Sequence, residues 1–94
     1  GASAACTRDA APAVPDGSAA SLEEMKAAQQ AVKAYQASSN AFLACLDAEG
    51  QAAGAEEPAE AKAARVASYN AAVDEQTDLA ARFNAAVQAY KSRN

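Results

Sequence analysis

Two long stretches of the chain place mostly apolar or small residues at alternating steps of three and four, and this pattern constrains the fold most. The first stretch places these residues at the a and d positions of a heptad: Leu22, Met25, Gln29, Val32, Gln36, Ser39, Leu43 and Leu46. In the second stretch the same positions hold Val66, Tyr69, Val73, Gln76, Ala80, Phe83, Val87 and Tyr90. Because residues three and four apart share one face of an α-helix, the pattern predicts two long helices.

Capping and turn residues mark the ends of these helices. The sequence SLEE at 21–24 is a capping box, which begins the first helix. The sequence EGQAAGAEEP at 49–58 holds two glycines and a proline and is the only interruption between the heptads. We therefore predict a first helix at about 21–49, a loop at 50–56 and a second helix at about 57–92. So short a connection makes the helices antiparallel.

Folding about a loop at 50–56 sets the register of the hairpin. It places Gln29 opposite Gln76 and Gln36 opposite Tyr69. Polar pairs of this kind in an apolar seam cost stability but fix the alignment of the helices.

One flank of the predicted seam forms an apolar groove. Its residues are Ala28, Tyr35 and Phe42 on the first helix, and Ala72 and Leu79 on the second. Cys45 lies on the same side of the first helix, where Ala31 and Ser38 are small enough to leave room. We expect another segment of the chain to cover this groove.

The segment before Ser21 is the expected occupant. Pro12 and Pro15 oppose helix formation, so this segment is extended. Ser21 and Cys45 are separated by roughly 36 Å along a helix, and the chain from Cys6 to Ser21 can reach roughly 46 Å in a polyproline conformation. A Cys6–Cys45 disulfide is therefore possible if the segment runs back along the first helix.

We call residues 1–20 the strap. Its prolines fall on one face of a three-fold helix and can stack on Tyr35, Tyr69 or Tyr90, while Val14 fills a gap. The residues expected to pack strap against groove are Pro12, Val14, Pro15, Tyr35, Phe42, Tyr69, Leu79 and Tyr90. The predicted fold is a single all-α domain: a two-helix antiparallel hairpin at 21–94 with an extended strap that is disulfide-bonded to its first helix.

The composition explains why such a tether is needed. Alanine accounts for 31 of the 94 residues and buries little surface, so the hydrophobic core is small. A disulfide between the two cysteines would close a loop of about 40 residues and contribute roughly 4 kcal/mol. Two separate free thiols are the alternative. A disulfide predicts an oxidising compartment, periplasmic or extracellular, reached after removal of a signal peptide and with or without a lipid anchor before Cys6.

The chain offers little for catalysis. It has no histidine, and its carboxylates are expected in the loop or on outward helix positions. The carboxylates of DEQTD at 74–78 would splay around a helix rather than gather a metal ion. We predict no enzyme activity, no catalytic residue, no metal and no cofactor. A net charge of −4 without a basic stripe argues against nucleic acid, and no apolar run is long enough to span a membrane.

Two surfaces are candidates for binding. One is an alanine-rich outer face of the first helix, which alanine's high helix propensity also explains. The other is the open end of the hairpin, where aromatic and basic residues lie together: Val87, Tyr90, Lys91 and Arg93. Alternatively, Tyr90 only covers the strap.

The chain from Cys6 to Leu46, followed by Tyr69 to Tyr90, resembles a group of small exported proteobacterial proteins. The shared features are a Cys…Pro…Pro-Asp-Gly start, a first helix of the form V..Y......FL.CL and a second of the form YN..V.........FN..V..Y. The resemblance implies a location in the bacterial envelope and brings no catalytic residue with it.

These observations favour a non-catalytic periplasmic or secreted module that acts through contacts with a protein or an envelope component, as a monomer or a homodimer. A second hypothesis is a carrier of a small apolar ligand or lipid, in which the strap opens and the ligand fills the groove of Tyr35, Phe42 and Leu79. A third is a homodimer in which two hairpins form a four-helix bundle.

Overall fold

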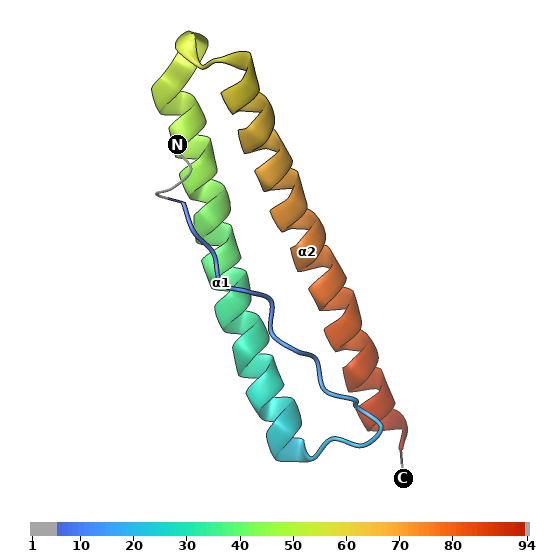
Figure 1. The fold of residues 1–94 in the computed structure, drawn as a ribbon. Helices are drawn as coiled ribbons and strands as arrows, with labels where there is room; N and C mark the ends of the chain where they lie inside the picture. Colours follow the sequence, from blue (N-terminus) through green and yellow to red (C-terminus); the bar gives the residue numbers. More distant parts are fainter. Residues whose placement is uncertain (1–5, 94) are drawn as a thin grey trace.

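The computed structural model describes residues 6–93 and shows an antiparallel pair of long helices (Figure 1). α1 spans Leu22–Ala53 and α2 spans Ala59–Ser92, and the short 3-10 helix η2 at Gly54–Glu56 lies between them. The described part of the strap contains no helix or strand and runs back along the helices. The molecule is a rod of 60 × 17 × 15 Å. The predicted strapped hairpin is confirmed.

Local hydrogen bonds turn the strap into α1. The Asp16 carboxylate accepts bonds from the backbone N–H (2.9 Å) and the hydroxyl (2.6 Å) of Ser18, and these bonds lower the pKa of Asp16. The Ser21 hydroxyl then accepts the N–H of Glu24 at 3.1 Å, while the Glu24 carboxylate accepts the N–H of Ser21 at 3.0 Å. This is the capping box expected from the sequence, and it lowers the pKa of Glu24.

The connection between the helices differs from the predicted loop at 50–56. α1 continues through Gly50 to Ala53, because one glycine in a helix costs only about 1 kcal/mol and good helix formers follow it. The helix ends at Gly54, whose φ of 58° is a conformation that other residues rarely adopt. Pro58 then directly precedes α2. The chain therefore reverses direction about three residues later than predicted.

Beside this reversal, Arg65 of α2 forms a fork of two hydrogen bonds to the Glu57 carboxylate, each 2.9 Å long. Both side chains are largely buried, and the Arg65 guanidinium lies beside Gly50 of α1. The paired geometry lowers the pKa of Glu57 and raises that of Arg65. The ion pair thus fixes the connection against both helices.

The later reversal makes the predicted register wrong. Gln76 donates a hydrogen bond to the Asn40 side chain at 3.0 Å, so it does not face Gln29. The Tyr35 hydroxyl bonds the Glu75 carboxylate, which places neighbouring Gln36 well away from the level of Tyr69. Moving the bend toward the C-terminus shifts every cross-helix pair in the same direction.

The buried face of the hairpin is also rotated from the predicted seam. On α2 the buried residues are Ala72, Leu79 and Ala86, one heptad apart on the groove flank. By contrast, the predicted seam residues Leu22, Val66 and Val73 are 49%, 41% and 37% exposed. A two-helix hairpin would centre its core between the helices. Here the strap adds a third wall, so the core lies where all three segments meet.

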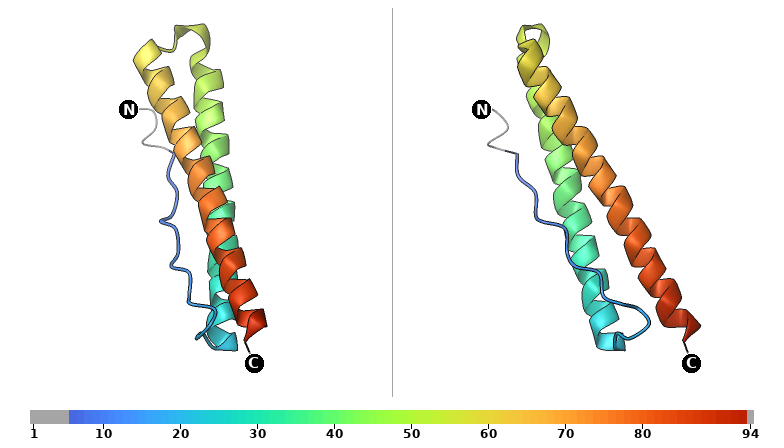
Figure 2. Two further views of the ribbon diagram at one scale, coloured as in Figure 1. Left: turned by 90° about the vertical axis from the view of Figure 1, so that its right-hand side faces the viewer. Right: turned by 45° about the vertical axis from the view of Figure 1, so that its right-hand side comes forward.

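The strap lies on one face of the helix pair, as the left view of Figure 2 shows. Two apolar clusters lie beneath it. The cluster at the open end contains Ala20, Met25 and Ala86, with Val14, Val87 and Tyr90 packed against them. The central cluster contains Val32, Tyr35 and Leu79, with Ala11, Val14 and Phe83 packed against them. Val14 belongs to both, so the strap joins the two halves of the core.

Candidate functional site

The first part of the site is the tether between strap and α1. Cys6 and Cys45 form a disulfide with a Cα–Cα distance of 5.6 Å, and Cys6 is buried. Three residues further, the backbone N–H of Asp9 donates to the hydroxyl of Ser38 at 3.1 Å. The small residue at position 38 thus leaves room for the strap and also binds it.

Arg8 connects the strap to both helices. Its guanidinium donates to the Glu75 carboxylate of α2 at 2.8 Å and to the Tyr35 hydroxyl of α1 at 3.3 Å. The guanidinium carbon also lies 5.4 Å from the centre of the Phe42 ring. The Tyr35 hydroxyl donates to Glu75 in turn. One strap residue therefore joins a closed polar network in the middle of the rod.

Sequence reasoning missed Arg8. The available signal was that Arg8 is the one basic residue of the strap and lies two residues after Cys6. Its long side chain could therefore reach the hydroxyl of Tyr35 in the predicted groove. Burial of Tyr35, followed by its hydrogen bond to Glu75, raises the pKa of this tyrosine above its usual value.

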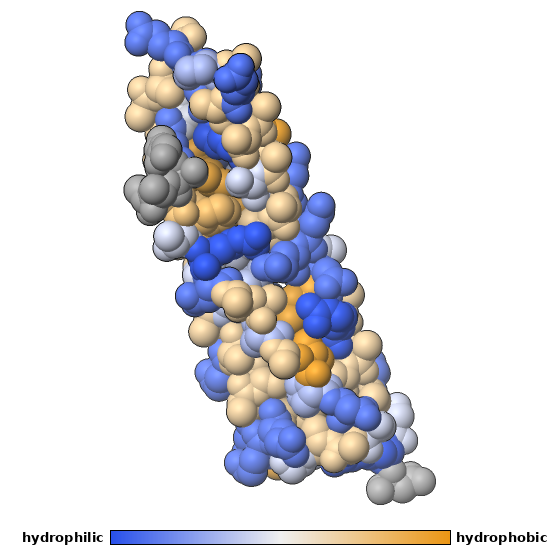
Figure 3. Space-filling view, in the orientation of Figure 1, coloured by the Kyte–Doolittle hydropathy of each residue, from blue (hydrophilic) through white to orange (hydrophobic). Residues whose placement is uncertain are grey.

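The predicted strap-packing residues occupy several different environments. Val14 packs against the central cluster, which contains Tyr35 and Leu79. Pro12 and Pro15 are half-buried, and Pro15 lines a shallow groove of about 380 Å³ between the strap and α1. Tyr69 belongs to neither cluster and lies half-buried in the half of α2 nearer the connection. On the strap face, strongly apolar surface is reduced to small patches beside the strap (Figure 3).

The strap turn is inserted at the open end of the hairpin. Gly17 is buried against the backbone of Ala86, at a spacing that leaves no room for a Cβ atom. Arg93 donates to the carbonyl of Gly17 at 3.1 Å and stacks its guanidinium 4.4 Å from the centre of the Tyr90 ring. Arg93, one of the four candidate partner-binding residues, is therefore engaged in holding the strap.

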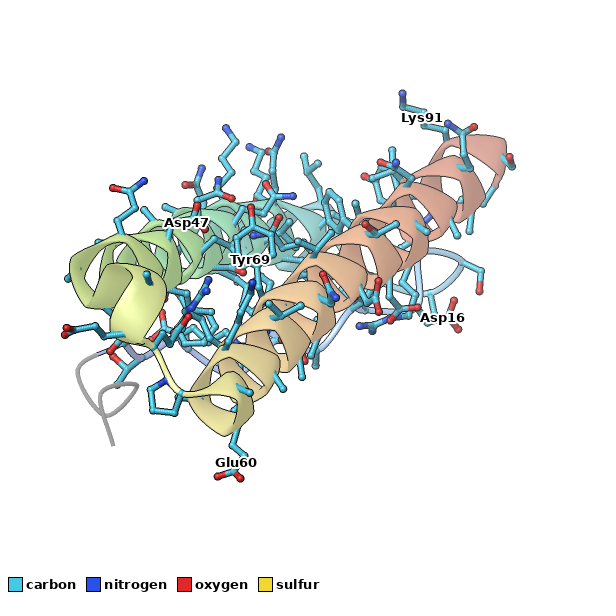
Figure 4. All side chains as sticks on the ribbon, turned by 90° about the horizontal axis from the view of Figure 1, so that it is seen from above. Asp16, Asp47, Glu60, Tyr69 and Lys91 are labelled. Carbon is cyan, nitrogen blue, oxygen red and sulfur yellow. A yellow bond between two sulfur atoms is a disulfide. The ribbon has the colours of Figure 1, made fainter. Side chains whose placement is uncertain are left out.

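The other three candidates, Val87, Tyr90 and Lys91, line an open groove of about 260 Å³ between the ends of the helices. The complete lining is Leu22, Met25, Lys26, Gln29, Phe83, Val87, Tyr90 and Lys91. Figure 4 places Lys91 on one side of the helix pair and Asp16, in the strap turn, on the other. We call this surface the open-end groove.

Several carboxylates are engaged in ion pairs. Arg82 and Asp78 pair at 2.8 Å on the exposed surface of α2, in addition to the pairs at Glu57 and Glu75. Within residues 6–93, no three His, Cys, Asp or Glu side chains are grouped so that they could hold a metal ion. None of the helices in this range is both long and apolar enough to cross a membrane.

Comparison of the chain with protein-family models, with curated proteins and with solved structures finds no match. Its function must therefore be inferred from its own residues.

Proposed function

We propose that this protein is a non-catalytic binding or structural module of the bacterial envelope, periplasmic or secreted, which acts through contacts with a protein or an envelope component. The observation that carries the proposal is the Cys6–Cys45 disulfide, which holds the strap in the core. Disulfides of this structural kind persist in oxidising compartments and are rare in reducing ones. The resemblance of the sequence to small exported proteobacterial proteins agrees with this location.

Two carboxylates are engaged in structural pairs, which favours a binding or structural role over a catalytic one. The Glu75 carboxylate is shared between Arg8 and Tyr35, and the Glu57 carboxylate is held by the fork from Arg65. Groups committed to such pairs stabilise one arrangement of the chain. A general base needs instead to face a space where substrate can approach.

A ligand carrier that uses the groove under the strap is less well supported. Tyr35 is 2% exposed and Leu79 is fully buried, because the strap's own side chains fill the space above them. An apolar ligand would have to displace Val14 and break the hydrogen bonds of Arg8. The groove of about 380 Å³ between the strap and α1 is shallow, whereas pockets for such ligands bury most of the ligand's surface.

The test combines a redox measurement with crosslinking in the cells that produce the protein. Thiols are trapped with a maleimide that adds mass, and the protein is then located by fractionation. The proposal predicts an oxidised protein in the envelope or the medium. It also predicts crosslinks to a protein or envelope component from photoreactive residues placed at exposed sites such as Lys33, Lys62 and Gln88. A reduced cytoplasmic protein, or the absence of crosslinks from every site, would refute it.

A further inference from the structure

We infer that the open-end groove docks an amphipathic helix of a partner protein, with carboxylates beside its apolar stripe. This inference rests on the proposed binding function and names the surface and chemistry through which it acts.

The floor of the groove is apolar and firmly supported. Met25 is buried in the open-end cluster, and Val87 and Tyr90 pack against that cluster from α2. Leu22, in the first turn of α1, is 49% exposed at the edge of the groove. The groove therefore presents apolar surface on side chains that the core already holds in place.

The strap explains why the groove is open. The right view of Figure 2 shows the helices separating toward this end, where the strap turn lies. Gly17 contacts the backbone of Ala86, so a segment of main chain occupies the space between the helix ends. The strap fills that space on its own face only. On the opposite face the seam stays unfilled, and a third segment can pack there.

The charges at the groove select the partner. Lys26 and Lys91 line it from the two helices, and none of the lining residues is acidic. This is an unusual local balance in a chain with 12 acidic and 8 basic residues. Within residues 6–93 the ion pairs all use arginine, so the two groove lysines, like the other lysines, have no acidic partner. Carboxylates on a partner would complement both ammonium groups.

The dimensions of the groove fit a short length of helix. From Leu22 to Gln29 it runs along two turns of α1, about 10 Å. A partner helix would bind there through apolar residues at i, i+3 or i+4, and i+7. A second copy of this chain fits less well, because symmetric contact of the two grooves would bring their lysines together.

The direct test uses a designed 18-residue helical peptide with leucines on one stripe, glutamates along both sides and one tryptophan. The protein has no tryptophan, so peptide fluorescence reports binding directly. For so small an interface we expect a Kd on the order of 100 µM. The same peptide with lysines in place of the glutamates should bind at least tenfold more weakly. NMR shifts should be confined to the groove methyl groups of Leu22, Met25 and Val87.

Matched variants locate the site. Leu22→Ser and the double variant Lys26→Glu/Lys91→Glu alter exposed positions of the groove, so the fold is retained. The first should weaken the glutamate peptide at least fivefold, and the second should reverse the preference in favour of the lysine peptide. Val66→Ser and the double variant Lys33→Glu/Lys62→Glu make corresponding changes outside the groove, with the same change in net charge, and should leave both affinities unchanged.

Several outcomes would overturn the inference: no binding of either peptide at millimolar concentration, equal binding of both, or shifts on the strap face. If the NMR shifts of the groove methyl groups accompany self-association seen in analytical ultracentrifugation, the groove binds a second copy of the chain. If they appear only with anionic lipid vesicles, it binds a membrane surface. If photoreactive residues at Lys33, Lys62 or Gln88 form crosslinks in cells and one placed at Leu22 in the groove does not, the groove is refuted while the proposed function stands. A reduced cytoplasmic protein refutes the proposed function while peptide binding to the groove is unaffected.

Discussion

Removing the tether should destabilise the whole molecule. The variant Cys6→Ser/Cys45→Ser opens a loop whose ends are 39 residues apart in sequence. By the loop-entropy relation, a cross-link of this span contributes about 4 kcal/mol to the free energy of unfolding. That is a large share of the roughly 5–15 kcal/mol typical of a folded domain. For a chain of 94 residues it corresponds to a fall in Tm of roughly 20 °C.

Thermal unfolding followed by circular dichroism at 222 nm measures this fall. Wild-type protein treated with dithiothreitol should melt like the double variant, and dithiothreitol should not change the variant. The strap would then exchange its amide hydrogens freely, and the ring of Tyr35 would become accessible to solvent. A Tm within about 3 °C of the wild-type value would show that the hairpin is stable without its strap, contrary to our reasoning.

Three further predictions concern single residues. Arg8→Ala should lower the free energy of unfolding by about 1–2 kcal/mol in urea titration, because it removes hydrogen bonds to both helices. The control Arg82→Ala removes an exposed ion pair of equal length and should lower it by under about 0.5 kcal/mol. Equal losses in the two variants would contradict the role of Arg8 in joining the strap to the helices. Gly17→Ala should cost about 1–3 kcal/mol in the same assay, since its Cβ atom would overlap the backbone of Ala86; a neutral result would exclude the close contact. Because the pKa of Tyr35 is raised in the folded state, stability is kept below pH 10 and falls as the pH rises through the folded pKa. Tyr35→Phe should remove this part of the alkaline loss in urea titrations at pH 9 and 11, and an unchanged loss would refute the assignment.

Most of the architecture follows from local signals in the sequence. The heptads predict both helices because their period matches the helical repeat, and the capping box at Ser21 begins α1 as expected. The prolines and the reach of an extended chain made a Cys6–Cys45 disulfide possible, and the structure contains it. These features depend on neighbouring residues, or on the length of chain between two residues, and both can be read from the sequence.

The register and the centre of the core depend on contacts between distant residues. Gly50 resembles a helix end, yet the helix continues to Ala53, and this difference moves the position of every pair across the hairpin. Heptad analysis assumes two packed elements, so it cannot place a core at the meeting of three. The role of Arg8 could not be predicted for the same reason, because its hydrogen-bond partners Tyr35 and Glu75 are far away in sequence.

The central claim is that the strap is the third wall of the core, and side-chain NOEs of the oxidised protein test it most directly. Val14 packs against both apolar clusters, each of which includes a residue of α2. The structure predicts NOEs from the methyl groups of Val14 to side chains of both clusters in the same spectrum. Random-coil shifts for Val14, with no NOE to either cluster, would contradict the claim.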